Sequence, residues 1–97
     1  MENLFNSLTH YGSWTLENER KFNDAEISAV ASATIVKSDW GKSVLFMMKS
    51  GGSCFVPVGR QSVDKVQVGQ NVNIENMRLL RLSKPGSPSI NRVEIDG

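Results

Sequence analysis

The chain of 97 residues has few side chains that could carry out covalent or metal chemistry. It contains one histidine, His10, and one cysteine, Cys54. A single cysteine excludes an intramolecular disulfide and a cysteine-based zinc cluster, and a lone histidine needs several converging carboxylates to hold a metal. The sequence has no glycine-rich phosphate loop and no nucleophile elbow. We therefore expect a non-enzymatic protein without a metal or cofactor.

Side chains suited to non-covalent binding surround a turn signal at residues 38–41. Trp40 lies in this turn, with Lys37 and Lys42 on either side. An indole at a loop tip can stack a base, and neighbouring ammonium groups can hold phosphates. The alternative is that Trp40 folds back over the core as a lid.

Two glycines, Gly51 and Gly52, separate the apolar runs 43–49 and 53–58 and predict a hairpin. A two-residue loop would place Phe46 opposite Pro57. Counting outward from that loop assigns the side chains to two faces. One face carries Val44, Phe46, Met48 and Phe55, and the other carries Leu45, Met47, Lys49, Cys54, Val56 and Val58.

Both faces of this hairpin are apolar, which leaves two interpretations. In one, both faces are buried, the second by an N-terminal arm or by another subunit. In the other, the core receives Leu45, Met47, Val56 and Val58. Phe46 and Phe55 then point outward as a stacking platform, worth about 1–3 kcal/mol per base. The sequence favours the second interpretation.

Charge is distributed unevenly along the chain, although the net charge is only +1. Residues 1–26 hold five acids and two bases, whereas residues 37–92 hold nine bases and three acids. This asymmetry suggests a polyanionic partner, and the alternative is a merely solvated surface. The further groove candidates are Arg78, Lys84 and Arg92, with Lys84 at the start of the loop 84–88.

The elements that must position these side chains are predicted to be mainly strands. Residues 1–22 are expected to form an N-terminal arm or short helix, anchored by Trp14 and Phe22, and residues 23–97 a single barrel. A helix is the alternative for the first strand, because Ala29, Ala31 and Ala33 would also suit one. A short helical or irregular connection should follow the third strand, and a rigid loop should cover 84–88. The five predicted strands cover residues 26–37, 43–49, 53–58, 68–83 with a turn at its start, and 90–95.

This order of elements is that of an all-β, five-stranded OB-fold-like Greek-key barrel. Residues 30–93 resemble small OB-fold single-stranded-DNA-binding proteins of phages and mobile elements. The resemblance rests on the segments VKSDWG at 36–41, VLFMMKSGGSCFVPV at 44–58, VGQNV at 68–72 and RLLRLSK at 78–84. Residues 93–97 depart from the cellular members, because they are not a long acidic tail. Recruitment of partners through such a tail is therefore not implied.

The resemblance implies sequence-tolerant binding of single-stranded DNA in phage or plasmid replication or recombination, in the cytoplasm of a bacterial host. RNA binding and a homodimer stay open. The first eight residues do not look like a signal peptide, and no apolar run approaches the roughly 18–20 residues of a membrane span. The competing class is a protein-interaction or virion structural module on the same small barrel. The expected DNA contacts are Lys37, Trp40, Lys42, Phe46, Met48, Phe55, Arg78, Lys84 and Arg92.

Overall fold

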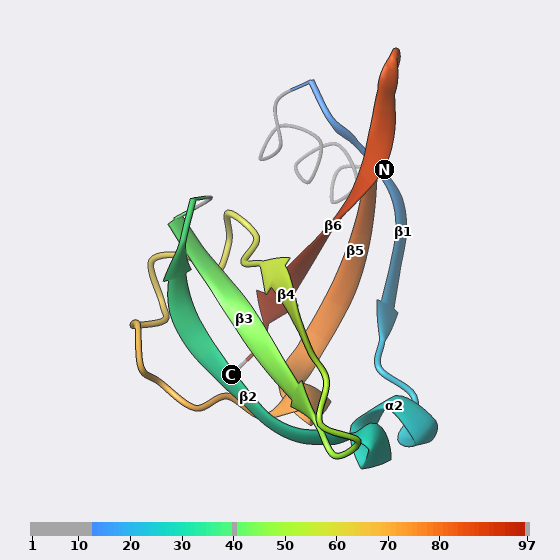
Figure 1. The fold of residues 1–97 in the computed structure, drawn as a ribbon. Helices are drawn as coiled ribbons and strands as arrows, with labels where there is room; N and C mark the ends of the chain where they lie inside the picture. The colour runs from blue at the N-terminus through green and yellow to red at the C-terminus, as the bar shows by residue number, and fades with distance from the viewer. Residues whose placement is uncertain (1–12, 40, 97) are drawn as a thin grey trace.

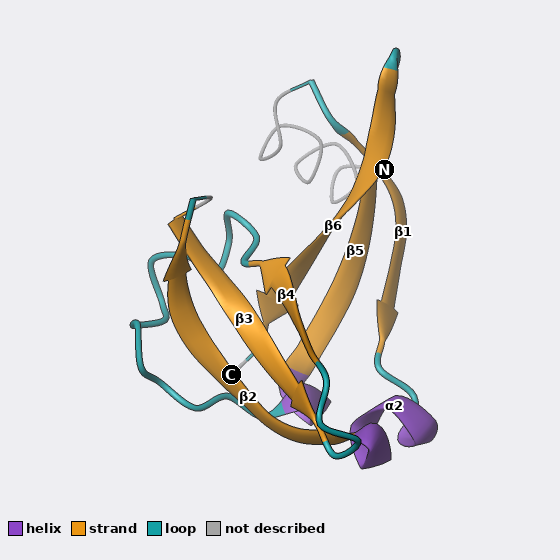
Figure 2. Cartoon of the chain, viewed as in Figure 1, coloured by secondary structure: helices purple, strands orange, loops and turns teal. Residues whose placement is uncertain are grey.

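A computed structural model describes residues 13–39 and 41–96 of the chain. Within that part, six strands form two three-stranded antiparallel sheets, with one short α-helix and one 3-10 turn (Figures 1 and 2). The all-β prediction is confirmed, whereas the predicted count of five strands is wrong. The two sheets form no closed barrel over the described residues. A single parallel bridge, between Val58 and Val93, joins them.

The first sheet consists of two consecutive hairpins made by β2 (Val30–Ser38), β3 (Gly41–Met48) and β4 (Ser53–Pro57). Alternate side chains of neighbouring strands point into the core, as expected for a sheet with one buried face. Ile35 of β2 and Val44 of β3 lie opposite each other and are completely buried.

The turn between β3 and β4 contains three residues instead of the predicted two. The amide of Met48 donates to the carbonyl of Gly52 (2.8 Å), and the amide of Gly51 donates to the carbonyl of Met48 (2.9 Å). Gly51 has a φ of 103°, in the left-handed region that favours glycine. A tight turn followed by a left-handed glycine is a common three-residue hairpin loop.

This longer turn changes the register of the hairpin. Phe46 lies opposite Cys54 instead of Pro57, a shift of three residues. An odd shift moves side chains to the other face, so Phe46 and Phe55 lie on opposite faces of the sheet. Phe46 is only 3% exposed, whereas Phe55 is 61% and Met47 40% exposed. The predicted orientation is confirmed for Phe55 and wrong for Phe46 and Met47.

The second sheet has β5 (Met77–Lys84) at its centre, flanked by β1 (Thr15–Lys21) and β6 (Ser87–Ile95). The sequence did not predict β1, because its run of mostly charged, exposed residues shows no apolar alternation. The β5–β6 turn places Pro85 before Gly86, whose φ is 79°, the arrangement of a type II turn. The predicted loop 84–88 is therefore shorter than expected, and the β5–β6 hairpin extends beyond the rest of the molecule (Figure 1).

Helix α2 (Asp24–Ala29) occupies the beginning of the predicted first strand. Its cap is reciprocal: the Asn23 side chain accepts from the Glu26 amide (2.8 Å), and the Glu26 carboxylate accepts from the Asn23 amide (2.9 Å). This capping box fixes the start of the helix. The strand begins only at Val30, so the prediction of a strand from residue 26 is wrong and the helical alternative forms instead.

The connection between β4 and β5 contains no strand among its residues, all of which the structure describes. It makes turns at residues 60–65 and a 3-10 turn, η1 (Ile74–Asn76), before β5. The predicted strand over residues 68–74 is wrong, because Asn71 makes only an isolated bridge to Thr34. The short irregular connection predicted after the third strand is confirmed and extends further than expected.

Two apolar clusters hold the elements together. The larger one lies between the sheets and consists of Ala33, Ile35, Val44, Phe46, Val58, Val66, Ile74, Met77, Val93 and Ile95. The smaller one, Leu80 and Leu82, lies on the opposite face of β5 and is covered by Trp14, Leu16 and Ile90. Phe22 packs against the larger cluster. The predicted packing of the two anchors, Trp14 and Phe22, is therefore confirmed, while residues 1–12 of the predicted arm lie outside the described residues.

Candidate nucleic-acid interface

The two lysines that flank the β2–β3 turn lie opposite each other but have different surroundings. Lys37 is exposed. The ammonium of Lys42 donates to the backbone carbonyls of Val63 (2.8 Å) and Val66 (2.6 Å). Lys42 therefore fastens the connector to the sheet, and contact with a phosphate would cost these hydrogen bonds. Trp40, predicted in the same turn, lies outside the described residues.

Phe46 and Met48 point into the space between the sheets. The Phe46 ring lies 5.8 Å from the Phe22 ring, centroid to centroid, at an angle of 50°. Met48 is half-buried and packs beside the larger cluster. Neither side chain contributes to the outer face of the sheet, where Phe55 lies.

Arg78 is surrounded by carboxylates of its own chain. Its guanidinium contacts Asp96 (2.8 Å) and Glu19 (2.8 Å). The hydrogen bond to Asp96, with a smaller contribution from Glu19, raises the pKa of Arg78, and the same bond lowers the pKa of Asp96. With two acids in contact, this cation contributes little positive field towards a phosphate.

Two further arginines, Arg20 and Arg81, also face acids. Arg20 makes a bidentate pair with Glu26 (2.7 and 2.9 Å), and Arg81 lies 3.9 Å from Glu17. The pKa of Glu26 falls from its ordinary 4.5 to about 2, chiefly through the hydrogen bonds from Arg20 and also through the Asn23 amide. The acids of the N-terminal segment thus neutralise bases that the charge count had assigned to a partner.

The exposed ring of Phe55 lies between two hollows on the molecular surface. The first, of about 370 Å³, has Lys37 among its walls. The second, of about 470 Å³, is formed where β4 and β6 approach each other, and contains Trp14 and Arg92. Phe55 and Pro57 line both hollows. We call the two hollows together the Phe55 groove.

The Trp14 end of the groove combines an aromatic ring with a cation. The ammonium of Lys84 lies 5.6 Å from the centre of the Trp14 ring, within the range of a cation–π contact. Lys84 is exposed and makes no ion pair with any residue of the described ranges. Arg92 donates to the backbone carbonyl of Asn91 (3.0 Å) and lines the same hollow.

The structure therefore brings together only part of the predicted site. Lys37, Phe55 and Arg92 line one groove, and Lys84 joins them through Trp14. The predicted residues that lie elsewhere are Lys42, Phe46, Met48 and Arg78. Trp14 was identified from the sequence only as an anchor. Its place in the groove depends on pairing between β1 and β5 across more than sixty positions of sequence, which no local signal shows.

Among residues 13–39 and 41–96, no three histidine, cysteine, aspartate or glutamate side chains gather as metal ligands. Within the same ranges, no helix is long and apolar enough to cross a membrane. Comparisons with protein-family models, with curated proteins and with solved structures find no match to this chain.

Proposed function

We propose that this protein binds single-stranded DNA with little sequence preference, along the Phe55 groove. The observation that carries the proposal is the position of Phe55, whose ring is 61% exposed on a strand between two hollows that each hold a cation. An exposed aromatic ring within a groove lined by cations is the arrangement on which proteins stack the bases of single strands.

A finer assignment of the fold belongs to the same proposal. Strands β2 to β6 follow the chain order of an OB-fold, with the β2–β3 and β5–β6 turns in the places of the two loops that grip ligands in that fold. The groove reaches Asp39 of the first turn on one side and Ser89, near the second turn, on the other. β1 and α2 are then additions that precede the barrel.

The chemistry of the groove suits a flexible polyanion with flat bases. Lys37, Lys84 and Arg92 attract the phosphates, while Phe55 stacks a base and Trp14 contributes an aromatic edge to the groove. Every base has a π-face, so this mode of binding tolerates any sequence. Duplex DNA should bind more weakly, because its bases stack on one another. A role in phage or plasmid replication or recombination follows as part of the proposal.

The test compares F55A with M47A in binding to a fluorescent oligo-dT, measured by anisotropy. Both variants remove an exposed apolar side chain from the same face of the sheet, but only F55A removes a ring. We expect F55A to weaken binding by about 1–3 kcal/mol and M47A to leave it unchanged. W14A should weaken binding as well, but it also uncovers Leu80 and Leu82, so its melting curve is compared with that of the wild type. Equal affinities of F55A, M47A and the wild type would contradict the proposal.

A second candidate function rests on a different feature of the same face. Leu45 lies directly opposite Phe55, and the exposed Met47 follows on the same side of β3. These three side chains form an apolar patch that suits a contact between two copies of the chain. If F55A and M47A both dissociate a dimer in sedimentation experiments while DNA affinity stays unchanged, the patch is a subunit interface.

A further inference from the structure

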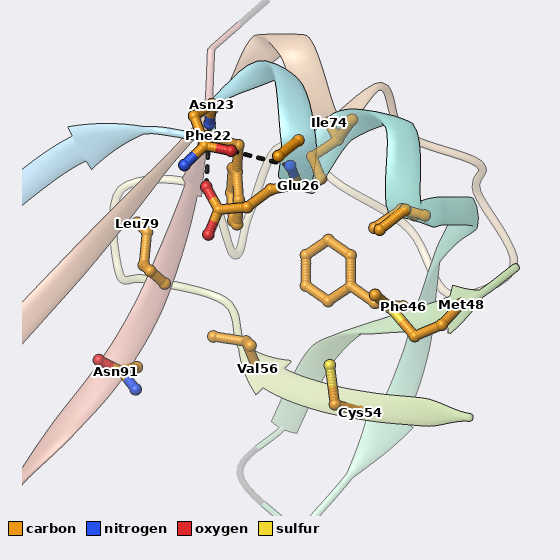
Figure 3. Close-up of a pocket in the computed structure, with 13 residues that line it drawn as sticks. Phe22, Asn23, Glu26, Phe46, Met48, Cys54, Val56, Ile74, Leu79 and Asn91 are labelled. Carbon is orange, nitrogen blue, oxygen red and sulfur yellow. Dashed lines mark hydrogen bonds between the residues drawn. The ribbon is translucent and has the colours of Figure 1, made fainter. Parts of the chain in front are cut away.

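A third hollow, of about 450 Å³, lies between the two sheets and α2, and its walls are mainly apolar (Figure 3). Phe22 and Leu79 form one side, and Met48 and Cys54 form the other. Its volume lies within the range of small-molecule binding sites. We call it the inter-sheet pocket.

This pocket adjoins the Phe55 groove. Val56 of β4 and Asn91 of β6 line both the inter-sheet pocket and the hollow that contains Trp14 and Arg92. A strand that follows the groove from Phe55 to Arg92 would therefore pass the mouth of the pocket, with a cation beside that mouth.

The walls of the pocket suit a flat aromatic ring. The tilted rings of Phe22 and Phe46 contribute from the core. The sulfur of Met48 lies beside Phe46 on β3, and Figure 3 shows the Cys54 sulfur of β4 directed into the pocket. Thioether and thiol groups make favourable contacts with aromatic rings. An aliphatic ligand would fill the space but would not use these contacts.

Three polar residues border the pocket, and Asn23 is one of them; its side-chain oxygen accepts from the Glu26 amide as the cap of α2. Glu26 also borders the pocket, but its carboxylate already accepts from Arg20 and from the Asn23 amide. The Asn91 side chain makes no hydrogen bond to a residue in the described part of the chain. Its amide offers one donor group and one acceptor, which the edge of any base can match.

We infer that the inter-sheet pocket takes one base of the bound strand, turned out from its neighbours and hydrogen-bonded to Asn91. The inference rests on the proposed function and adds a base-insertion site to it. Because the amide can serve all bases, the site keeps the binding tolerant of sequence. It also accounts for an apolar hollow that opens beside a cationic groove.

The first test fills the pocket from α2. A29L places a larger side chain on the pocket wall, whereas S28L places the same side chain on the next residue of the helix, outside the pocket. We expect A29L to bind oligo-dA and oligo-dT about tenfold or more weakly, and S28L to bind like the wild type. Circular dichroism and melting curves of both variants check that they are folded.

The second test uses Cys54, the only cysteine of the chain, as a reporter on the pocket wall, where it is exposed to reagents in the free protein. Saturating oligonucleotide should slow alkylation of Cys54 by iodoacetamide severalfold in the wild type and in S28L. Free deoxyadenosine at the same base concentration should give little protection, because it lacks the contacts of the groove. N91L should weaken binding of both oligonucleotides by about threefold to tenfold.

The outcomes separate the inference from the function on which it rests. If the wild type binds no single-stranded oligonucleotide, both are wrong. If it binds, but A29L binds as tightly as S28L and Cys54 reacts at an unchanged rate, only the base-insertion site is wrong. Protection of Cys54 by deoxyadenosine alone would make the pocket a nucleoside site and overturn its link to the strand.

Discussion

Two regions of the molecule differ in the surroundings of their cations: the part of the sheet β1-β5-β6 that carries Arg78 and Arg81, and the Phe55 groove, to which Lys84 of β5 and Arg92 of β6 also belong. In the sheet β1-β5-β6, Arg78 and Arg81 face carboxylates of the same chain, and Arg20 beside them is held by Glu26. Around the sheet β2-β3-β4, Lys37 has no such partner among the described residues and lies in a hollow beside an exposed phenylalanine.

This difference shows why a count of basic residues is a poor guide to a binding surface. The sequence places nine bases between residues 37 and 92, but the acids of the N-terminal segment cross the molecule on β1 and neutralise some of them. A binding surface for a single strand is better indicated by the cations that lie beside exposed aromatic rings. The predictions below test the contrast, from the largest expected effect to the smallest.

The inner and outer faces of the β3–β4 hairpin should respond differently to loss of a ring. F46A removes a buried ring from the core and should lower the free energy of unfolding by about 3–5 kcal/mol. F55A should change it by about 0.5 kcal/mol or less, because its ring is already in solvent. Urea unfolding of both variants measures this, and equal losses would contradict the observed register.

Arg78 should matter for stability and not for DNA. R78M removes the contacts to Glu19 and Asp96 and should cost about 1 kcal/mol, since both acids can be rehydrated at the surface. Affinity for oligo-dT should stay within twofold of the wild type. R81M, which removes a longer contact of 3.9 Å, is the matched control and should cost less. A strong loss of DNA affinity in R78M would show that Arg78 belongs to the DNA interface, which would contradict the proposed groove.

Acid should weaken the link between β1 and α2 through Glu26. The pKa of Glu26 is lowered from 4.5 to about 2 in the folded chain, so the unfolded chain takes up the proton first. The stabilisation is therefore complete above about pH 4.5 and is lost as the pH falls towards 2. E26Q should be less stable than the wild type at pH 7 and show a shallower loss between pH 4.5 and 2. D24N, which alters the neighbouring acid of α2, is the control in urea unfolding across this range.

The smallest expected effect is that of single lysines on the salt dependence of binding. Each phosphate contact adds about 0.7 to the slope of log K against log salt for a single strand. K37A and K84A should each flatten that slope by up to one such step, with little change in stability. K49A, a lysine of the β3–β4 turn outside the groove, should leave the slope unchanged. If K37A, K84A and K49A all keep the slope of the wild type, Lys37 and Lys84 make no phosphate contact.

The sequence predicted the parts of the fold that have strong local signals. The β2–β3 turn and the β3–β4 hairpin lie where expected, although the register of the hairpin differs, and β5 covers the second part of the strand predicted over residues 68–83. Helix α2 also had a signal that was not used: Asn23 and Glu26 have the spacing of a capping box. The strand β1 had none, because it is stabilised by pairing with β5 and by Trp14 and Phe22 at its ends.

The candidate site was harder to predict than the fold, because it depends on register and on distant pairings. Gly51 and Gly52 predict a hairpin equally well with a two-residue or a three-residue loop, and the choice decides whether Phe46 or Met47 is buried. The contacts of Lys42 could not be predicted from the local sequence either. Nothing beside it in sequence indicates that its ammonium reaches carbonyls more than twenty residues away.

The hydrogen bonds of Lys42 to Val63 and Val66 can report on whether the connection between β4 and β5 stays attached to the sheet. An amine that donates to two carbonyls is shielded from acylating reagents as long as the connector stays closed. Lys37, directly across the strand pair, is open to the same reagent at all times. The ratio of their acetylation rates, read by mass spectrometry, would therefore measure how often the segment between β4 and β5 detaches while the sheets remain folded.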